Sequence, residues 1–298
     1  MSSATWPFGD YPDGGLQELS SHVTAFFSEG FPLSNAAIVR GADASLVFDT
    51  ANLRHARTLR VAVPETPPLR EVVISHMHGD HAHGAMHFQP VRVWSRTFTR
   101  DRLAFWAEHD LGPYGEEYER YLPGAREEYE RLRIVVPDTV LDERGAIDLG
   151  GGVVVRLFPE ATAHTPGDLW ALVEPDGVAL CGDLWFNAVE PNISQGSIEG
   201  SLAALARLRE ARAEVYLPGH GPAGRLEPDD MMERFCAWLG ASIDGHMNEG
   251  SSGEALAQAV REEFEEQKTS SDDPIAFAFE WEDALEGAVG RAESPSYE

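Results

Sequence analysis

Over Ser75–Gly84 the chain reads Ser-His-Met-His-Gly-Asp-His-Ala-His-Gly, directly after a short apolar run. Alternate residues at the end of a strand point to the same side, so His76 and His78 can reach one point. Asp80 and His81 follow a glycine bend and can reach a second point. Imidazole nitrogens and carboxylate oxygens are common ligands of Zn²⁺. The segment therefore predicts two adjacent metal positions at the end of a buried strand.

Three more candidate ligands lie far along the chain. His164 occupies a loop after a strand-like segment, and His220 lies between two glycines that allow close approach to a ligand. Asp183 follows the apolar run 178–181, where an unpaired carboxylate would be costly. A bound cation or a salt bridge to an arginine would each explain that carboxylate. The neighbouring histidine motifs favour the cation.

The segment His76-Met-His-Gly-Asp-His81 matches the HxHxDH signature of the metallo-β-lactamase-fold superfamily. Four other segments resemble the remaining signatures of that superfamily and follow in the same order: Val47-Phe-Asp49-Thr, Ala163–Gly167, Cys181-Gly-Asp183 and Leu217–Gly221. Five motifs in register are far more specific than any one of them. The resemblance covers roughly residues 20–240.

This resemblance implies an α/β fold, a four-layer α/β/β/α sandwich, with a centre that holds two Zn²⁺ ions per chain; iron or manganese are the alternative metals. The implied ligands are His76, His78 and His164 for the first ion and Asp80, His81 and His220 for the second, with Asp183 as the bridge. Asp49 would buttress the metal loops. Asp80 would also orient the bridging solvent and accept its proton, which makes it the catalytic residue.

The element pattern predicts strands that include Val135–Leu141 and Val178–Cys181, and it also predicts how the chain is divided. Two strand-rich halves, each closed by helices, indicate one hydrolase domain over residues 1–245. Helical spacing over about 97–133 predicts an insertion, which either lies near the mouth of the site or covers one face of a sheet. Residues 246–298 are predicted to form a helical, acidic extension that is partly disordered at its end.

The composition limits the partners. Fifty acidic residues against 23 basic ones give a net charge of −27, which repels phosphate backbones. We therefore expect no nucleic-acid partner and no membrane association. The two cysteines build no disulfide framework, and the first residues lack the features of a secretory signal, so we expect a cytoplasmic protein. A homodimer is left open.

The expected reaction is acyl transfer to water, with metal-bound hydroxide as the nucleophile and an ester or thioester as the substrate. The segment Gly196–Arg209 is similar to thioesterase/cyclases of aromatic polyketide pathways with this fold, which implies a bulky small-molecule or carrier-bound acyl substrate. Aromatic and neutral residues of the motif loops are expected to contact that substrate: Trp170, Trp185, Phe186, Asn187 and Asn192.

Three alternatives stay open. An iron-dependent dioxygenase could use a subset of the same ligands, and a lactonase or β-lactamase-like hydrolase could use all of them. A non-catalytic binding protein is the third, although such descendants usually lose ligands. His83 and His87 lie just beyond the cluster and are interpreted as partners of the ligands or as substrate contacts.

Overall fold

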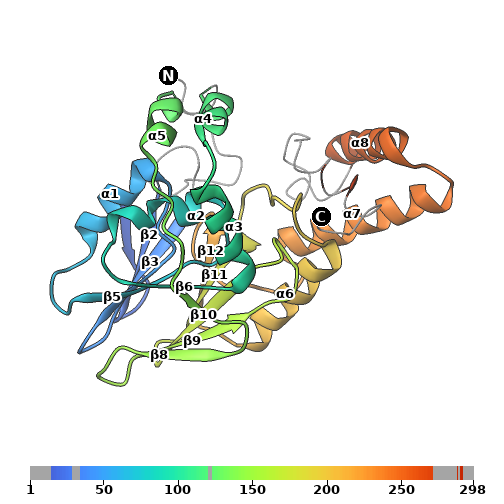
Figure 1. Ribbon diagram of the computed structural model, residues 1–298. Helices are drawn as coiled ribbons and strands as arrows, with labels where there is room; N and C mark the ends of the chain where they lie inside the picture. The colour runs from blue at the N-terminus through green and yellow to red at the C-terminus, as the bar shows by residue number, and fades with distance from the viewer. Residues whose placement is uncertain (1–14, 29–33, 120–122, 271–286, 288, 291–298) are drawn as a thin grey trace.

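The computed structural model describes residues 15–28, 34–119, 123–270, 287 and 289–290 of the 298-residue chain. Two twisted sheets lie at its centre, with helices on their outer sides (Figure 1). The predicted α/β class and four-layer sandwich are confirmed. None of the described helices is both long and apolar enough to cross a lipid bilayer.

The first sheet has seven strands in sequence order. Its first four strands are antiparallel, and the later ones pair in parallel. The strands are β1 (Gly15–Glu18), β2 (Val23–Phe27), β3 (Asn35–Arg40), β4 (Ser45–Phe48), β5 (Leu69–Val73), β6 (Arg92–Ser95) and β7 (Thr139–Val140). Parallel pairing places the carboxyl ends of β4 and β5 at one edge, where the histidine-rich segment begins.

The second sheet has five strands in the order β12-β11-β10-β9-β8. They are β8 (Gly145–Asp148), β9 (Val154–Pro159), β10 (Leu169–Glu174), β11 (Val178–Phe186) and β12 (Val215–His220). β11 and β12 run parallel, and the other neighbours are antiparallel. The inner faces of both sheets bury one apolar cluster between them, to which Val39, Phe48, Leu157 and Leu180 belong.

Helices close both outer faces. α1 (Leu53–Ala62) and α3 (Thr97–Ala107) cover the first sheet through residues such as Leu59 and Leu103. The second sheet is covered by α6 (Ile198–Glu210) and α7 (Met231–Asn248), with α8 (Gly253–Ser270) packed into the same apolar cluster. Ser197 caps α6, as its side chain accepts from the backbone N–H of Gly200, which satisfies an otherwise unpaired donor.

The predicted insertion is helical. It holds α3 and two short helices, α4 (Gly112–Tyr118) and α5 (Ala125–Arg131), which pack on each other and project above the sheets (Figure 1). Gly115 permits their close approach, because a Cβ there would lie 2.9 Å from both the Cα of Arg126 and the Cβ of Tyr129. Most of the tail predicted to be partly disordered falls outside the described residues.

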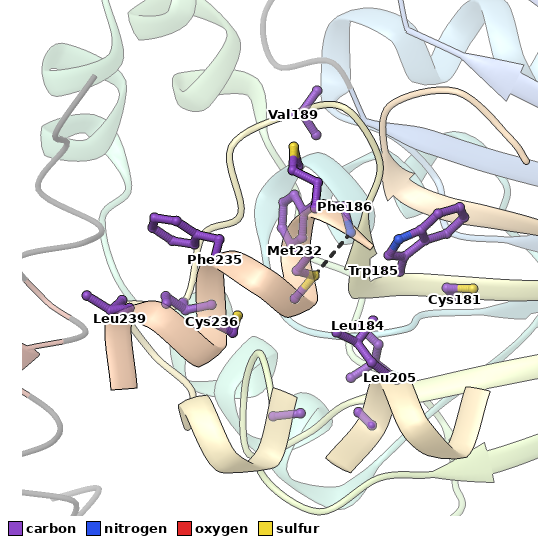
Figure 2. Close-up of a cluster of buried hydrophobic side chains, with 14 of the residues drawn as sticks. Cys181, Leu184, Trp185, Phe186, Val189, Leu205, Met232, Phe235, Cys236 and Leu239 are labelled. Atoms are coloured by element: carbon purple, nitrogen blue, oxygen red, sulfur yellow. Dashed lines mark hydrogen bonds between the residues drawn. The ribbon is translucent and has the colours of Figure 1, made fainter. Parts of the chain in front are cut away.

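Two strand predictions need correction. The segment predicted as a strand over 135–141 forms a ladder only at Thr139–Val140. The strand predicted to stop at Cys181 continues to Phe186, with a shift of register at Gly182. Figure 2 shows how α7 holds that longer strand, since the Phe186 backbone N–H lies 3.4 Å from the Met232 sulfur. The extension of β11 carries Asp183 inside the strand rather than after it.

Candidate metal centre

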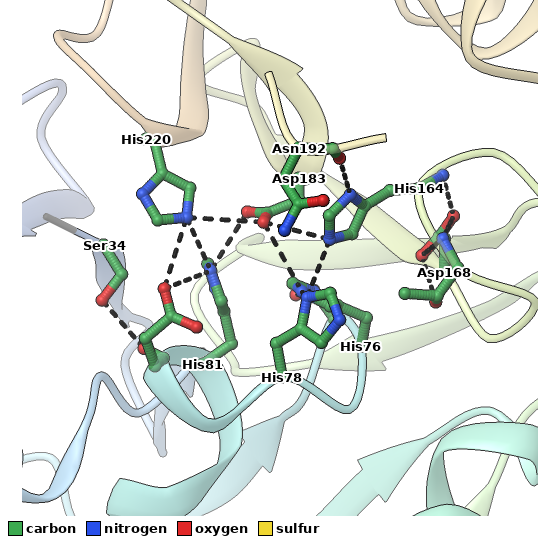
Figure 3. A network of polar contacts seen from close by, with 12 residues as sticks. Ser34, His76, His78, His81, His164, Asp168, Asp183, Asn192 and His220 are labelled. Atoms are coloured by element: carbon green, nitrogen blue, oxygen red, sulfur yellow. Dashed lines mark hydrogen bonds and ion pairs between the residues drawn. The ribbon is translucent and has the colours of Figure 1, made fainter. Parts of the chain in front are cut away.

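The seven predicted ligands converge at the edge where strands of both sheets end (Figure 3). His76 and His78 lie between β5 and the short helix α2 (Gly79–Ala82), which itself carries Asp80 and His81. His164 lies in the loop between β9 and β10. Asp183 comes from β11, and His220 is the last residue of β12. The structure therefore brings together residues that are up to 144 positions apart in sequence, His76 and His220.

One group of ligand atoms surrounds the first position. The Nδ1 atom of His78 lies 3.0 Å from Nε2 of His76 and 2.9 Å from Nε2 of His164. The Oδ2 atom of Asp183 lies 3.2 Å from Nε2 of His164 and 3.6 Å from Nε2 of His76. Three ring nitrogens and one carboxylate oxygen thus face a single point.

A second group lies beside it. The Nε2 atom of His220 is 3.3 Å from Oδ2 of Asp80 and 3.3 Å from Nε2 of His81. Nε2 of His81 is in turn 3.0 Å from Oδ1 of Asp183. The Asp183 carboxylate therefore contacts both groups: Oδ2 lies near His164 and, at 3.4 Å, near His220, while Oδ1 faces His81.

These separations fit metal coordination. Ligand atoms about 2.0–2.1 Å from a tetrahedral ion lie about 3.4 Å apart, close to the distances between the ring nitrogens and carboxylate oxygens here. The Oδ1 atom of Asp183 is also buried, and Nε2 of His81, 3.0 Å away, does not meet the geometry of a hydrogen bond with it. A cation between these two atoms would satisfy both of them. The donors form a metal site that fits two ions.

Comparison with known proteins agrees with this geometry. Residues 30–220 match the model of the metallo-beta-lactamase superfamily. The chain belongs to that superfamily. No curated protein matches the chain.

Solved structures share the superfamily fold with this member. A metallo-beta-lactamase from Pontibacter korlensis is 18% identical with a TM-score of 0.56, over 72% of this chain and 94% of that one. One from Hirschia baltica is 17% identical with a TM-score of 0.55, over 76% and 96%. The inverting sec-alkylsulfatase Pisa1 from Pseudomonas sp. is 16% identical with a TM-score of 0.68. Its match covers 95% of this chain, which spans 51% of that protein.

Asp49 holds the loop that carries His76 and His81 through hydrogen bonds. Its Oδ1 accepts a hydrogen bond from the Ser75 backbone N–H at 2.7 Å, and its Oδ2 accepts one from the Ser75 hydroxyl at 2.7 Å. The same Oδ2 lies 2.9 Å from Nδ1 of His81. The Ser75 hydroxyl also contacts Nδ1 of His76 at 2.9 Å. One buried carboxylate therefore orients two ligand rings, in agreement with the buttressing role that the resemblance implies.

The other ligand rings have partners that the sequence analysis did not identify. Nδ1 of His164 lies 2.7 Å from the Asn192 carbonyl oxygen, and Nε2 of His78 lies 3.1 Å from Oε1 of Gln195. Asp168 accepts a hydrogen bond from the His164 backbone N–H at 2.8 Å. Burial raises the pKa of Asp168 to about 7. The turn-forming sequence Thr165-Pro-Gly-Asp168 was the available signal, since aspartate commonly closes such turns.

The ligand histidines differ in the direction in which their surroundings shift the pKa. Burial lowers the pKa of His164 to about 3 and that of His76 well below its usual value, so both rings are neutral, as metal ligands must be. Burial also disfavours charge on His81 and His220, but the neighbouring carboxylates together outweigh it, with Asp183 the largest contributor and Asp80 the next. These carboxylates raise the pKa of His220 to about 9 and that of His81 well above its usual value.

A cavity of about 610 Å³ opens onto the ligand cluster, with Asp80, Asp183 and His220 in its lining. The lining also holds aromatic side chains: Trp106, Tyr114, Tyr118 and Tyr129 come from the insertion, and Phe186 comes from β11 beside His220. The insertion therefore lies at the mouth of the site, the first of its two predicted placements, while α3 also packs on the first sheet.

Of the residues expected to contact the substrate, only some line the cavity. Phe186 and Asn192 line the cavity, and Asn187 does not. Trp170 is buried against Phe158 and donates a hydrogen bond to Glu160. Trp185 is 1% exposed in a buried apolar cluster (Figure 2), and its indole N–H donates to Asp230. Both tryptophans belong to the apolar cluster under the outer helices and are therefore core residues.

Proposed function

We propose that the chain is a two-metal hydrolase that cleaves an ester or thioester of a bulky, planar acyl group. The observation that carries the proposal is a cavity whose lining combines ligands of both groups with aromatic side chains. Aromatic walls bind planar groups by stacking and by burial of apolar area. The metal centre would then face the bond that such a group brings into the cavity.

Two bound Zn²⁺ ions would supply an acidified water and polarise the attacked carbonyl oxygen. The chain's own contribution begins with Asp80, whose Oδ2 faces His220 while the residue lines the cavity. In that position the carboxylate can orient an attacking water and accept its proton. Phe186 stacks on His220 with ring centroids 5.1 Å apart and planes 2° from parallel, which fixes the tilt of that ring.

The lining also bears on the charge of the substrate. No lysine or arginine lines the cavity among the described residues, whereas Glu128 and Glu190 add carboxylates to those of the ligand cluster. Glu128 is paired with Arg54 at 2.9 Å. Anionic tails are normally held by basic side chains, so this lining supports an uncharged acyl group. That property agrees with the resemblance of Gly196–Arg209 to polyketide thioesterase/cyclases.

A sulfate ester is the second candidate. The observation that favours it is the reach of the sec-alkylsulfatase match, which covers 95% of this chain. The absence of lysine and arginine from the described lining speaks against it, because a sulfate group carries a negative charge into the cavity.

The test pairs metal analysis with a substrate panel. Mass spectrometry of the purified protein should give about two zinc ions per chain, as the two ligand groups imply. The panel holds aryl esters, acyl thioesters, lactones, β-lactams, phosphodiesters and secondary alkyl sulfates. We expect turnover of uncharged aryl esters or thioesters and none of the alkyl sulfates.

The variant Asp183→Ala separates metal-dependent hydrolysis from other outcomes. It removes the ligand shared by both groups, so metal content and hydrolysis should fall together. Hydrolysis that persists without metal would refute the proposal. Iron with oxygen consumption would favour a dioxygenase instead, and turnover confined to alkyl sulfates would favour the second candidate.

A further inference from the structure

We infer that His83 is a specificity-determining residue that hydrogen-bonds a hydroxyl group on the planar part of the substrate. The inference rests on the proposed function and narrows the substrate class to hydroxylated aryl groups. The imidazole of His83 is a buried polar group that does not belong to either group of metal ligands.

His83 is the first residue of the short 3-10 helix η1 (His83–His87) and is 8% exposed. Its Nε2 atom is buried and has no hydrogen-bond partner among the described residues. Leaving a buried polar atom unpaired destabilises a fold, so such atoms are rare and call for an explanation. The ring also forms part of the cavity lining, and rotation of this side chain would bring Nε2 to a ligand that supplies the missing partner.

The His83 ring packs between a glycine of the metal loop and two aromatic residues of the insertion. On one side it packs on Gly79, where a Cβ would lie 2.4 Å from its Cε1 atom. On the other side it meets Tyr129 at 5.7 Å between ring centroids and Trp106 at 6.4 Å, both nearly perpendicular. His83 thus lies between the metal loop and two aromatic residues of the insertion.

This position selects the chemistry of the ligand. A neutral imidazole offers one donor and one acceptor, and a phenolic hydroxyl can satisfy either of them. A planar ring that lies along Trp106 and Tyr129 brings its edge to His83. A carboxylate or sulfate at that edge would meet the carboxylates of the cavity without a basic partner among the described lining residues. A hydroxyl group fits both conditions.

The experiment compares phenylacetyl thioesters of N-acetylcysteamine that carry no hydroxyl or one hydroxyl at the 2, 3 or 4 position. We expect the wild-type protein to prefer at least one isomer about tenfold in kcat/KM, the usual effect of one hydrogen bond. His83→Phe keeps an aromatic ring and removes both nitrogens. It should reduce that preference to about one while the unsubstituted thioester is still hydrolysed.

Two further variants exclude a general loss of structure. His83→Gln places an amide near the position of Nε2 and should keep part of the preference. His87→Phe is the matched control, because His87 ends the same helix and does not line the cavity. That variant should discriminate like the wild type. A preference that is absent from the wild type, or unchanged in His83→Phe, would overturn the inference.

A binding measurement keeps this test separate from the proposed reaction. Phenylacetamide and its three hydroxy isomers are uncharged and resist hydrolysis, and calorimetry gives their Kd values with the metal-loaded protein. The same roughly tenfold preference, lost in His83→Phe, is expected even if no thioester is turned over. In that case the reaction would be wrong and the inference right. Equal binding of all four amides, or none, would refute the inference.

Discussion

The Oδ2 atom of Asp49 lies 2.9 Å from Nδ1 of His81, and neither side chain is more than 1% exposed. This contact leaves Nε2 of His81 to face the Asp183 carboxylate, 3.0 Å away. The residue that fixes the ring is itself fixed, because Asp49 also accepts two hydrogen bonds from Ser75. The end of β4 is thereby connected to the ligand cluster through one carboxylate.

Replacing Asp49 by asparagine should therefore weaken metal binding without removing a ligand. Loss of such a supporting partner typically costs 10–100-fold in metal affinity. Titration against a chromophoric chelator measures that affinity. Asp176→Asn is the matched control, because Asp176 also pairs with a histidine, His22 at 2.9 Å, in a contact outside the ligand cluster. Equal affinities of the two variants would show that the Asp49 contact does not matter.

Gly219 should be intolerant of any side chain. A Cβ at this position would lie 1.8 Å from Oδ1 of Asp183 and 2.7 Å from the backbone of Gly182. Gly219→Ala must therefore displace the bridging carboxylate, and we expect loss of at least one metal ion per chain with loss of hydrolysis. Elemental analysis of the purified variant measures this.

The control for that substitution is Gly245→Ala, in the last turn of α7, where an added Cβ meets nothing within 4 Å. Alanine in a helix interior is more stable than glycine by about 0.5–1 kcal/mol, so this variant should unfold at a slightly higher temperature with its metal content unchanged. Full metal occupancy in Gly219→Ala would contradict the clash.

Metal binding should release protons at neutral pH. In the metal-free protein the pKa of His220 is raised to about 9, with Asp183 as the main favourable charge, so its ring carries a proton at pH 7. A cation must displace that proton, and affinity for Zn²⁺ should therefore rise as the pH increases from 6 to 8, the usual behaviour of metal ligands that bind deprotonated. Calorimetric titrations in buffers of different ionisation enthalpy count the protons released.

The same raised pKa has a consequence for the metal-free fold. The charged His220 ring stabilises the metal-free fold fully below the unfolded pKa near 6.5, and this stabilisation is lost as the pH rises through about 9.

The variant His220→Gln is the control for the proton release. It lacks this titrating group, so it should release fewer protons on metal binding than the wild type. An equal number of protons in both proteins would assign the release to other groups.

The ligand cluster could be predicted because its signals are local. His76, His78, Asp80 and His81 lie within six positions after a strand, and a strand end fixes where they point. The remaining ligands were found by motif and order, and all of them reach the same edge of the sheets. The supporting contacts of Asn192 and Gln195 were not predicted, because a loop distant in sequence carries no pattern that shows which ring it meets.

The aromatic residues that line the cavity were harder to predict from the sequence than the ligands. The sequence predicts that Trp185 lies in a loop, because the apolar run that begins at Val178 ends at Cys181, whereas β11 continues to Phe186. Gly182, with a φ of +53°, shifts the register and lets the strand continue, so Trp185 turns towards α7 while Phe186 reaches the cavity. The insertion supplies most of the other aromatic residues, and its helical spacing alone did not decide between its two placements.

Substitution of two tryptophans should consequently affect different properties: substrate binding for Trp106 and stability for Trp185. Trp106 lines the cavity, so Trp106→Ala should raise KM for aryl substrates about tenfold, as expected when a stacking surface of about 1–1.5 kcal/mol is lost. Trp185 is buried and donates to Asp230 at 2.8 Å, so Trp185→Phe should lower the free energy of unfolding by about 2 kcal/mol. Its KM should stay close to that of the wild type. Steady-state kinetics and urea unfolding of both variants separate the two effects, and a raised KM in Trp185→Phe with none in Trp106→Ala would mean that the substrate binds elsewhere.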